Sequence, residues 1–108
     1  MSKQKNFNIG KAQQLCLVYK KKRQYSKAQL VSKLIEWQHF FGTQSIVGVK
    51  ISLCDCYRRK TVETVLKDLG YELEPDSFSN PIQRGLYGVT YGRDTNFSFR
   101  EASSDATK

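Results

Sequence analysis

CYRRKTVETVLKDLGYELE, residues 56–74, joins a basic segment to an amphipathic helix and then to a short alternating run. The apolar positions share one face of a helix with 3.6 residues per turn: Val62, Val65, Leu66 and Leu69. Gly70 is expected to end this helix, because glycine readily adopts the left-handed conformation found there. Residues 71–74 then alternate as a strand does. The stretch therefore predicts a third helix over about 56–69 followed directly by a strand.

The start of this helix is basic, although acids are preferred at the positive end of the helix dipole. Arg58 lies near the apolar stripe, so the helix either projects beyond the core there or begins near residue 58. Tyr57 is expected to point outward, and Asp55 to cap the helix. A basic N-terminus suits a helix that meets phosphates, since the dipole and the side chains attract the same anion. The alternative is a set of long cationic side chains that simply reach water.

Two helices precede this stretch. Asn8 is expected to cap the first, whose apolar positions are Ile9, Ala12, Leu15, Cys16 and Tyr19. Leu17 and Val18 widen that face, which predicts a well-buried helix. The helix ends in the basic run KKKRQ, residues 20–24.

A capping box of Ser26 and Gln29, with a hydrophobic staple between Tyr25 and Leu30, predicts the start of the second helix. Gly42 is expected to end it. About two residues join the first two helices, which indicates an angled or antiparallel pair.

Short strands are predicted on either side of the third helix. Residues 45–53, SIVGVKISL, alternate β-branched and small or polar residues as a strand does. Residues 85–92, GLYGVTYG, are expected to pair with residues 71–74 as a hairpin. Phe97 and Phe99 are compatible with one more short edge strand, and the end of the chain is expected to be a disordered tail.

The net charge of +8 is concentrated in the first two thirds of the chain. Residues 1–23 carry seven Lys or Arg and no acid, and residues 24–70 carry seven cations against four acids. Residues 71–108 carry four cations against six acids. This distribution is typical of a face that binds a polyanion, and the alternative is a basic protein whose charge serves solubility.

The composition of the chain also limits the other classes of protein to which it can belong. The 108 residues fit one domain, and no apolar run reaches the length of a membrane-spanning helix. Three cysteines indicate reduced thiols and a cytoplasmic protein rather than a disulfide framework. Paired carboxylates, a serine elbow and a phosphate-binding glycine loop are all missing, so no enzymatic activity and no cofactor are predicted. Two alternatives use Cys54, Cys56 and His39: a zinc site, or a cysteine nucleophile with a histidine base.

The order helix, helix, strand, helix, strand, strand resembles the winged helix-turn-helix superfamily. RRKTVETVLKDLGYELE followed by GLYGVTYG is similar to the end of such a domain, where a Leu-Gly-aromatic turn ends the third helix and a β-hairpin wing follows. The resemblance implies an α+β, winged helix-like fold of three helices on a small antiparallel sheet over residues 8–92. Residues 1–7 are then a flexible basic lead-in, and 93–108 a mostly disordered tail. Residues 42–54 depart from the family, which joins its second and third helices by a short turn.

The resemblance also implies double-stranded DNA binding, without a cofactor, by a regulator of transcription or of a phage or mobile element. Arg84 would reach the DNA from the wing. Base or groove contacts would come from the third helix and phosphate contacts from the remaining cations. The groove residues are Tyr57, Arg58, Arg59, Lys60 and Thr64. The phosphate residues are Lys20, Lys21, Lys22, Arg23, Lys27 and Lys67.

Two further points stay open in the sequence. A protein-interaction module or inhibitor that binds an acidic partner of the nucleic-acid machinery is the alternative function, because aromatic residues in the wing region are good interface anchors. Many members of the superfamily act as symmetric dimers. A homodimer of this chain would use the first helix or the wing, since no coiled-coil heptads are present.

Overall fold

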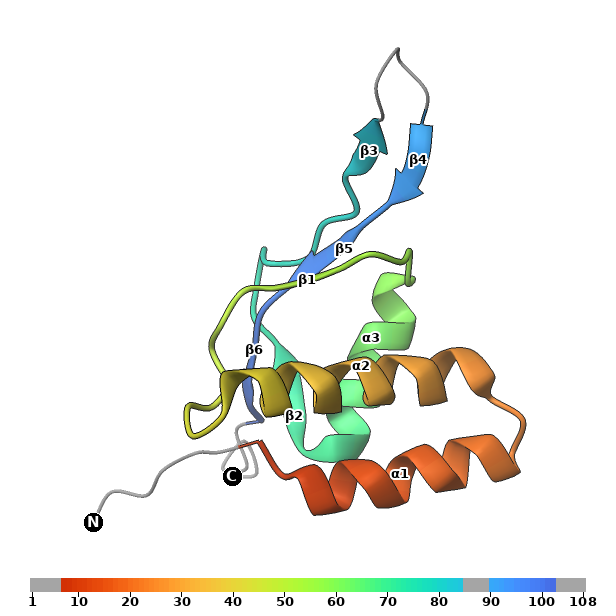
Figure 1. Ribbon diagram of the computed structural model, residues 1–108, viewed down its shortest axis with the longest axis vertical. Coiled ribbons are helices and arrows are strands. Elements are labelled where there is room, and N and C mark those ends of the chain that lie inside the picture. The colour runs from red at the N-terminus through yellow and green to blue at the C-terminus, as the bar shows by residue number, and fades with distance from the viewer. Residues whose placement is uncertain (1–6, 85–89, 103–108) are drawn as a thin grey trace.

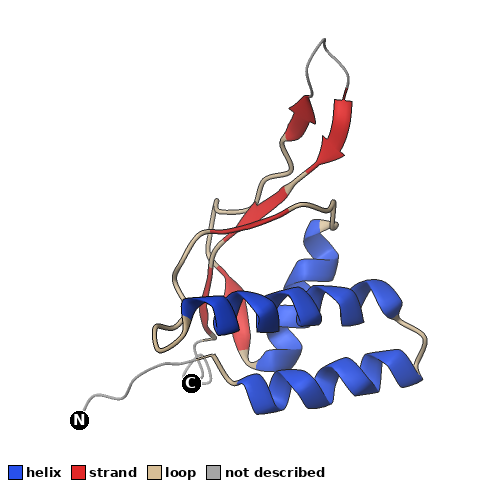
Figure 2. Cartoon of the chain, viewed as in Figure 1, coloured by secondary structure: helices blue, strands red, loops and turns tan. Residues whose placement is uncertain are grey.

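The computed structural model describes residues 7–84 and 90–102, and for residues 82–84, 90 and 91 the backbone alone. Three helices and short antiparallel strand pairs confirm the predicted α+β class and its winged helix-like arrangement (Figure 1). The helices gather at one end of the molecule, and the strands lead away from them (Figure 2). The elements are α1 (Ile9–Lys21), α2 (Tyr25–Phe41), β1 (Ile51–Leu53), α3 (Arg59–Leu69), β2 (Tyr71–Leu73), β3 (Ile82–Arg84), β4 (Thr90–Arg93), β5 (Thr95–Phe97) and β6 (Phe99–Glu101).

Helices α1 and α2 form an antiparallel hairpin, as their short connection predicts (Figure 1). The side chain of Asn8 accepts a hydrogen bond from the backbone N–H of Lys11 at 3.0 Å, which confirms the predicted cap. Leu17 is 63% exposed and Val18 is exposed as well, so the expectation of a well-buried helix is wrong. These two residues lie outside the face of α1 that packs against α2 and α3.

The start of α2 differs from its prediction. Gln24 is the N-cap and no side chain caps the helix, so the capping box of Ser26 and Gln29 is wrong. Tyr25 is 62% exposed and is the first residue of the helix rather than the residue before its cap, so the predicted staple with Leu30 is wrong. The side chain of Gln29 is used elsewhere, because it accepts a hydrogen bond from Tyr57. Gly42 ends the helix at φ 71°, as predicted.

The strand predicted over residues 45–53 is confirmed only in its last third, β1. Gly48, at φ 86°, lies in a turn that interrupts the alternating pattern, and its N–H donates to the carbonyl of Phe99 at 2.8 Å. The buried side chain of Gln38 holds the preceding segment, since it donates to the carbonyl of Gln44 at 2.7 Å and accepts from the N–H of Ile46 at 3.2 Å. Tertiary hydrogen bonds therefore override a local strand propensity.

Helix α3 begins at Arg59, with Arg58 as its N-cap, which confirms the second of the two positions proposed for its start. The predicted cap by Asp55 is wrong, because that carboxylate pairs with Lys33 of α2 at 3.0 Å. The predicted apolar stripe of α3 is buried throughout. Gly70 ends the helix in the left-handed conformation at φ 94°, as predicted.

A long irregular hairpin follows α3 and projects beyond the helices (Figure 1). The strand β2 pairs with β6, not with residues 85–92 as predicted, and residues 85–89 lie outside the described part of the chain. The two arms run antiparallel from this base through a bridge of Ser79 and Asn96 to the pair of β3 and β4. The strand β5 also pairs with β1. The projecting hairpin therefore starts from the core rather than from a separate short turn.

The prediction of a mostly disordered tail over 93–108 is wrong for residues 93–101, which form the end of β4, β5 and β6. Phe97 and Phe99 are fully buried in the core. The lead-in predicted over 1–7 is also too long, since Phe7 is buried and its ring stacks on Tyr71 with centroids 5.8 Å apart. Residues 1–6 and 103–108 lie outside the described part. No helix in the described residues is long and apolar enough to cross a membrane.

Candidate nucleic-acid interface

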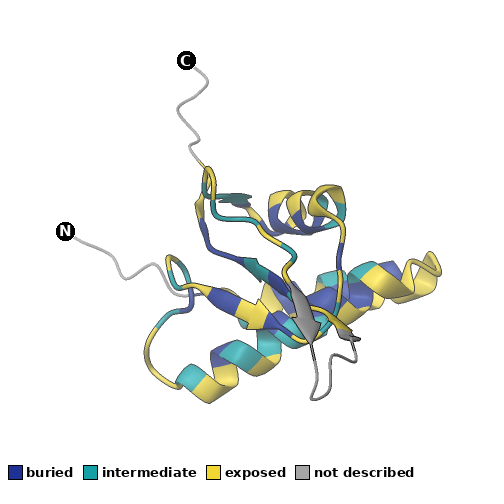
Figure 3. Ribbon diagram, turned by 90° about the horizontal axis from the view of Figure 1, so that it is seen from above, coloured by how far each residue is buried: buried dark blue, intermediate teal, exposed yellow. Residues whose placement is uncertain are grey.

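The outward face of α3 lies opposite its buried stripe and carries Lys60, Thr64 and Lys67. The two lysines are exposed and Thr64 is half-buried, as the helical period predicts. In Figure 3 the buried side of α3 faces the other helices and the exposed side faces away from them. This outward face therefore offers two ammonium groups and a hydroxyl, and the two exposed carboxylates of α3 lie on its flanks.

Both acids of α3 lie on its flanks and have partners. Glu63 accepts a hydrogen bond from Arg59 Nε at 3.0 Å, an ion pair one turn apart on the helix. Asp68, on the other flank, accepts a hydrogen bond from the hydroxyl of Tyr19 of α1 at 2.5 Å. Burial, together with the neighbouring Asp68 carboxylate, raises the pKa of Tyr19 well above its usual range. The hydroxyl therefore keeps its proton and its hydrogen bond to Asp68 at neutral pH.

Tyr57 is buried, with 5% of its surface exposed, so the prediction that it points outward to a groove is wrong. Its hydroxyl donates to Gln29 Oε1 at 3.0 Å, and its backbone N–H donates to Thr95 Oγ1 at 2.8 Å. Burial, and to a lesser degree the charge of Asp55, raises the pKa of Tyr57 to about 12. Tyr57 thus anchors the segment before α3 to α2 and β5, and this anchoring leaves Arg58 exposed at the N-cap.

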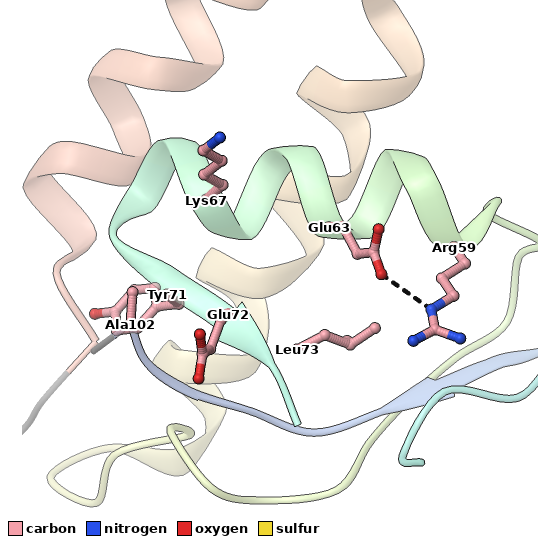
Figure 4. A pocket seen from close by; sticks show the side chains of 7 residues that line it. All are labelled: Arg59, Glu63, Lys67, Tyr71, Glu72, Leu73 and Ala102. Carbon is pink, nitrogen blue, oxygen red and sulfur yellow. Dashed lines mark hydrogen bonds and ion pairs between the residues drawn. The ribbon is translucent and has the colours of Figure 1, made fainter. Parts of the chain in front are cut away.

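A groove of about 380 Å³ runs between α3 and the base of the hairpin (Figure 4). Arg59 lies at this flank of α3, where Glu63 holds its guanidinium. On the opposite wall, Glu72 accepts a hydrogen bond from Arg100 Nε at 2.5 Å. The charges around the groove largely compensate each other, so the groove itself is not a polyanion site. Its lining residues are Arg59, Glu63, Lys67, Tyr71, Glu72, Leu73 and Ala102.

The second set of predicted phosphate residues lies at the turn between α1 and α2. Lys20, Lys21, Lys22 and Arg23 are all exposed, and Arg23 has a left-handed backbone at φ 62°. Lys27 is only partly exposed, and its ammonium lies 5.8 Å from the centre of the Tyr19 ring. Because Tyr19 reaches Asp68, the last turn of α1 lies beside α3. The structure therefore places the end of α1, from which this basic turn continues, near the C-terminal end of α3.

The projecting hairpin supplies two further cations. Arg84 belongs to β3, and its side chain is outside the described part. Arg93, in β4, is exposed and opposite Ile82 in the pairing of β3 with β4. Arg93 was missed because residues 93–108 were expected to be a tail. A hairpin centred on residues 85–89 would have placed it on the wing.

The zinc site considered for the thiols and the histidine is not found in the described part of the chain. Among the described residues, no group of three or more His, Cys, Asp or Glu side chains could hold a metal ion. All three cysteines are free: Cys16 is buried and donates to the carbonyl of Ala28, whereas Cys54 and Cys56 are exposed.

Comparisons of the chain with protein-family models, with curated proteins and with solved structures find no match. What the interface does therefore has to be argued from its own geometry. That geometry is a helix with a cationic outward face, a basic turn beside it and a hairpin that projects from the same core.

Proposed function

We propose that this protein binds double-stranded DNA through the outward face of α3. The observation that carries the proposal is the separation of charge on that helix. Lys60, Thr64 and Lys67 face outward, whereas the two acids lie on the flanks with partners of their own. A phosphate-rich ligand that approaches this face meets two ammonium groups between the flanking acids, and the exposed Arg58 at the N-cap adds to the attraction of the helix dipole.

The basic turn and the hairpin extend this interface. Lys20, Lys21, Lys22 and Arg23 supply phosphate contacts, which set affinity and salt dependence rather than sequence choice. Arg84 and Arg93 lie on the hairpin, which projects far enough from the core to act as a wing (Figure 1). Arg58, Lys60 and Thr64 contact base edges in the groove. The role of Arg59 is secondary, because Glu63 holds its guanidinium at the flank.

DNA is proposed rather than RNA because the element that would contact the bases is an α-helix, α3. An α-helix fits the wide major groove of B-form DNA, whereas the major groove of A-form RNA is deep and narrow. The order of elements and the wing support a winged helix-turn-helix regulator of transcription, or of a phage or mobile element, and the free thiols support a cytoplasmic location.

A salt series tests the proposal. Fluorescence anisotropy with labelled random duplex DNA should show binding at low salt that weakens steeply as salt rises. The slope of log K against log salt is about −0.9 for each phosphate contacted. Duplex RNA of the same length should bind more weakly. No binding to any duplex DNA at low salt would overturn the proposed function.

A second candidate function, binding of an acidic protein segment, is supported by a separate surface on α1. Leu17 and Val18 are exposed beside Lys20 and Lys21, and these four residues line a hollow of about 480 Å³ on α1. Apolar residues rimmed by cations suit a partner segment that alternates carboxylates with leucines. A synthetic peptide of that composition should bind the wild type and lose affinity for Leu17→Ser. Equal binding to both proteins would remove this candidate.

A further inference from the structure

Helix α2 carries an exposed aromatic surface that DNA binding does not use. Phe40 is 87% exposed, the highest value among the large apolar side chains of the described residues. It lines a hollow of about 340 Å³ with Glu36 and the half-buried Trp37, whose ring packs against Phe41 with centroids 5.6 Å apart. Lys33, at the preceding turn, completes a stripe with the spacing of one helical face. We call Lys33, Glu36, Trp37 and Phe40 the α2 stripe.

Two polar groups of the α2 stripe are without partners. Neither the carboxylate of Glu36 nor the indole N–H of Trp37 forms a hydrogen bond or an ion pair with a described residue. One is an acceptor and the other a donor only, and they are neighbours in the chain. The α2 stripe therefore presents a matched donor and acceptor on an apolar surface.

We propose that the α2 stripe is the contact surface for a second copy of this chain. In a twofold-symmetric contact, residue i meets residue j of the other copy while j meets i. Two antiparallel α2 helices, with the axis between Glu36 and Trp37, would bring each indole N–H to the carboxylate of the other copy. Phe40 would then pack against the aliphatic part of Lys33 from the second copy. The α2 stripe of one copy is therefore complementary to the α2 stripe of the other, as an interface made of the same surface on both copies requires.

Charge favours this surface over the other exposed apolar site. Two chains of charge +8 repel each other, so a self-contact needs a face without net charge. The α2 stripe has one cation and one acid, and its Lys33 is already paired with Asp55. Leu17 and Val18, by contrast, lie beside Lys20 and Lys21, and two copies of that face would oppose like charges.

The contact leaves the proposed DNA-binding face free. The segment before α3 is anchored at Gln29, and Phe40 lies 11 residues further along α2, roughly 16 Å away at 1.5 Å per residue. Figure 1 shows the C-terminal end of α2 on the side away from the start of α3. A dimer formed in this way carries two copies of α3, but its formation does not depend on nucleic acid.

Self-association can be measured on the full chain without DNA. One helix-on-helix contact is at the low end of specific interfaces, which bury roughly 1,200–2,000 Å². We therefore expect nuclease-treated protein to shift from dimer to monomer on dilution in sedimentation-velocity runs at moderate salt. Trp37 is the only tryptophan, so its emission should move to longer wavelength over the same dilution, because the indole becomes exposed to water.

Two matched variants test whether the α2 stripe is the surface through which two copies associate. Phe40→Ser removes a side chain that contributes little to the fold, and it should be monomeric at every concentration, with an unchanged helical spectrum and constant Trp37 emission. Leu17→Ser removes a similarly exposed apolar side chain on α1 and should dimerise as the wild type does. A wild type that is monomeric throughout, a Phe40→Ser dimer, or a monomeric Leu17→Ser would each overturn the proposal. Failure of DNA binding leaves this measurement unaffected, so the two proposals can fail separately.

Discussion

The hydroxyl of Tyr19 on α1 donates a hydrogen bond to the carboxylate of Asp68 on α3, with 2.5 Å between the oxygens. The bond joins two residues that are 49 positions apart and holds the basic end of α1 beside the third helix. The donor is a neutral hydroxyl, so Asp68 keeps its negative charge, but the bond directs the carboxylate towards α1. One hydrogen bond thus contributes both to packing and to the direction in which the Asp68 carboxylate points.

Replacing either partner of this bond should have opposite effects on DNA affinity. Tyr19→Phe leaves the Asp68 carboxylate without its donor, and we expect a loss of about 1–2 kcal/mol in the free energy of unfolding together with weaker DNA binding. Asp68→Asn removes the charge and should strengthen binding. Urea titrations and anisotropy measure the two quantities. If Tyr19→Phe bound DNA more tightly than Asp68→Asn, the electrostatic role of this pair would be wrong.

Glu63→Gln should increase affinity for duplex DNA. The substitution removes a carboxylate from the flank of α3 and releases the guanidinium of Arg59 for a phosphate contact, so the salt slope should steepen by about 0.9. The ion pair that it removes is exposed and is worth only about 0.3–0.5 kcal/mol of stability. Asp76→Asn is the control, since it makes the same change of charge in an exposed turn at φ 61°, a conformation that asparagine tolerates. An equal gain from both variants would indicate a general effect of net charge.

The two groups of cations should separate specificity from affinity. Arg58→Ala with Lys60→Ala should abolish the preference for a selected sequence over random duplex, at about 1–3 kcal/mol for each base that is no longer read. Alanine at Lys20–Arg23 should weaken all duplexes alike and reduce the salt slope by up to about 0.9 per phosphate contact. Lys50→Ala, an exposed cation in the segment before β1, is the matched control. Small and equal effects in the two groups would contradict the assignment of α3 as the reading helix.

Stability should fall in alkali because of the buried tyrosines. The pKa of Tyr57 is raised to about 12 from its usual value near 10, so the folded state retains the phenolic proton more strongly than the unfolded state does. The stabilisation is complete below about pH 10 and is lost as the pH rises towards 12. Tyr19 and Tyr71 are shifted in the same direction by burial. Tyrosinate absorbance and circular dichroism, followed together, should therefore show unfolding coupled to ionisation in this window.

Tyr57→Phe distinguishes this residue from the other tyrosines. The variant should lose about 1 kcal/mol of stability at neutral pH, because the hydrogen bond to Gln29 is missing. Its stability should also depend less on pH between 10 and 12. An unchanged alkaline transition in this variant would show that Tyr57 is not one of the groups that drive it.

Two glycines should respond to alanine in opposite ways. Gly70→Ala forces a Cβ into the left-handed conformation at φ 94° and should cost about 1–2 kcal/mol. Gly10→Ala lies in the first turn of α1, where the new Cβ would be 3.6 Å from Asn8 Oδ1, an ordinary van der Waals distance. It should stabilise the protein by about 0.5–1 kcal/mol. Thermal unfolding measures the change in stability of both variants. A destabilised Gly10→Ala would contradict the assigned helix cap.

Local patterns in the chain predicted most of the helical structure. The period of apolar residues identified all three helices, and Asn8, Gly42 and Gly70 mark ends that depend on local capping or on backbone conformation. The outward position of Lys60 and Lys67 followed from the same period. These predictions succeeded because each depends on residues within one or two turns of each other.

The errors have one physical origin, which is packing between distant segments. Tyr57 was assigned by helical rotation, but α3 begins after it, so the rotation does not apply and packing against Gln29 and Thr95 decides its position. Phe97 and Phe99 show strand alternation, yet their burial depends on β1, β2 and the aromatic ring of Phe7. Strand partners over such separations are set by the core as a whole.

The sequence by itself determined the three helices, the turn at Gly70, the excess of positive charge and the face of α3 that points outward. Each of these depends on backbone conformation, on side-chain period or on composition, which neighbouring residues specify. Only the tertiary structure decided which strands pair, that Tyr57 is buried, and that Tyr19 binds Asp68. The free energy of these arrangements comes from interactions between residues far apart in the chain, and no local pattern encodes the partner.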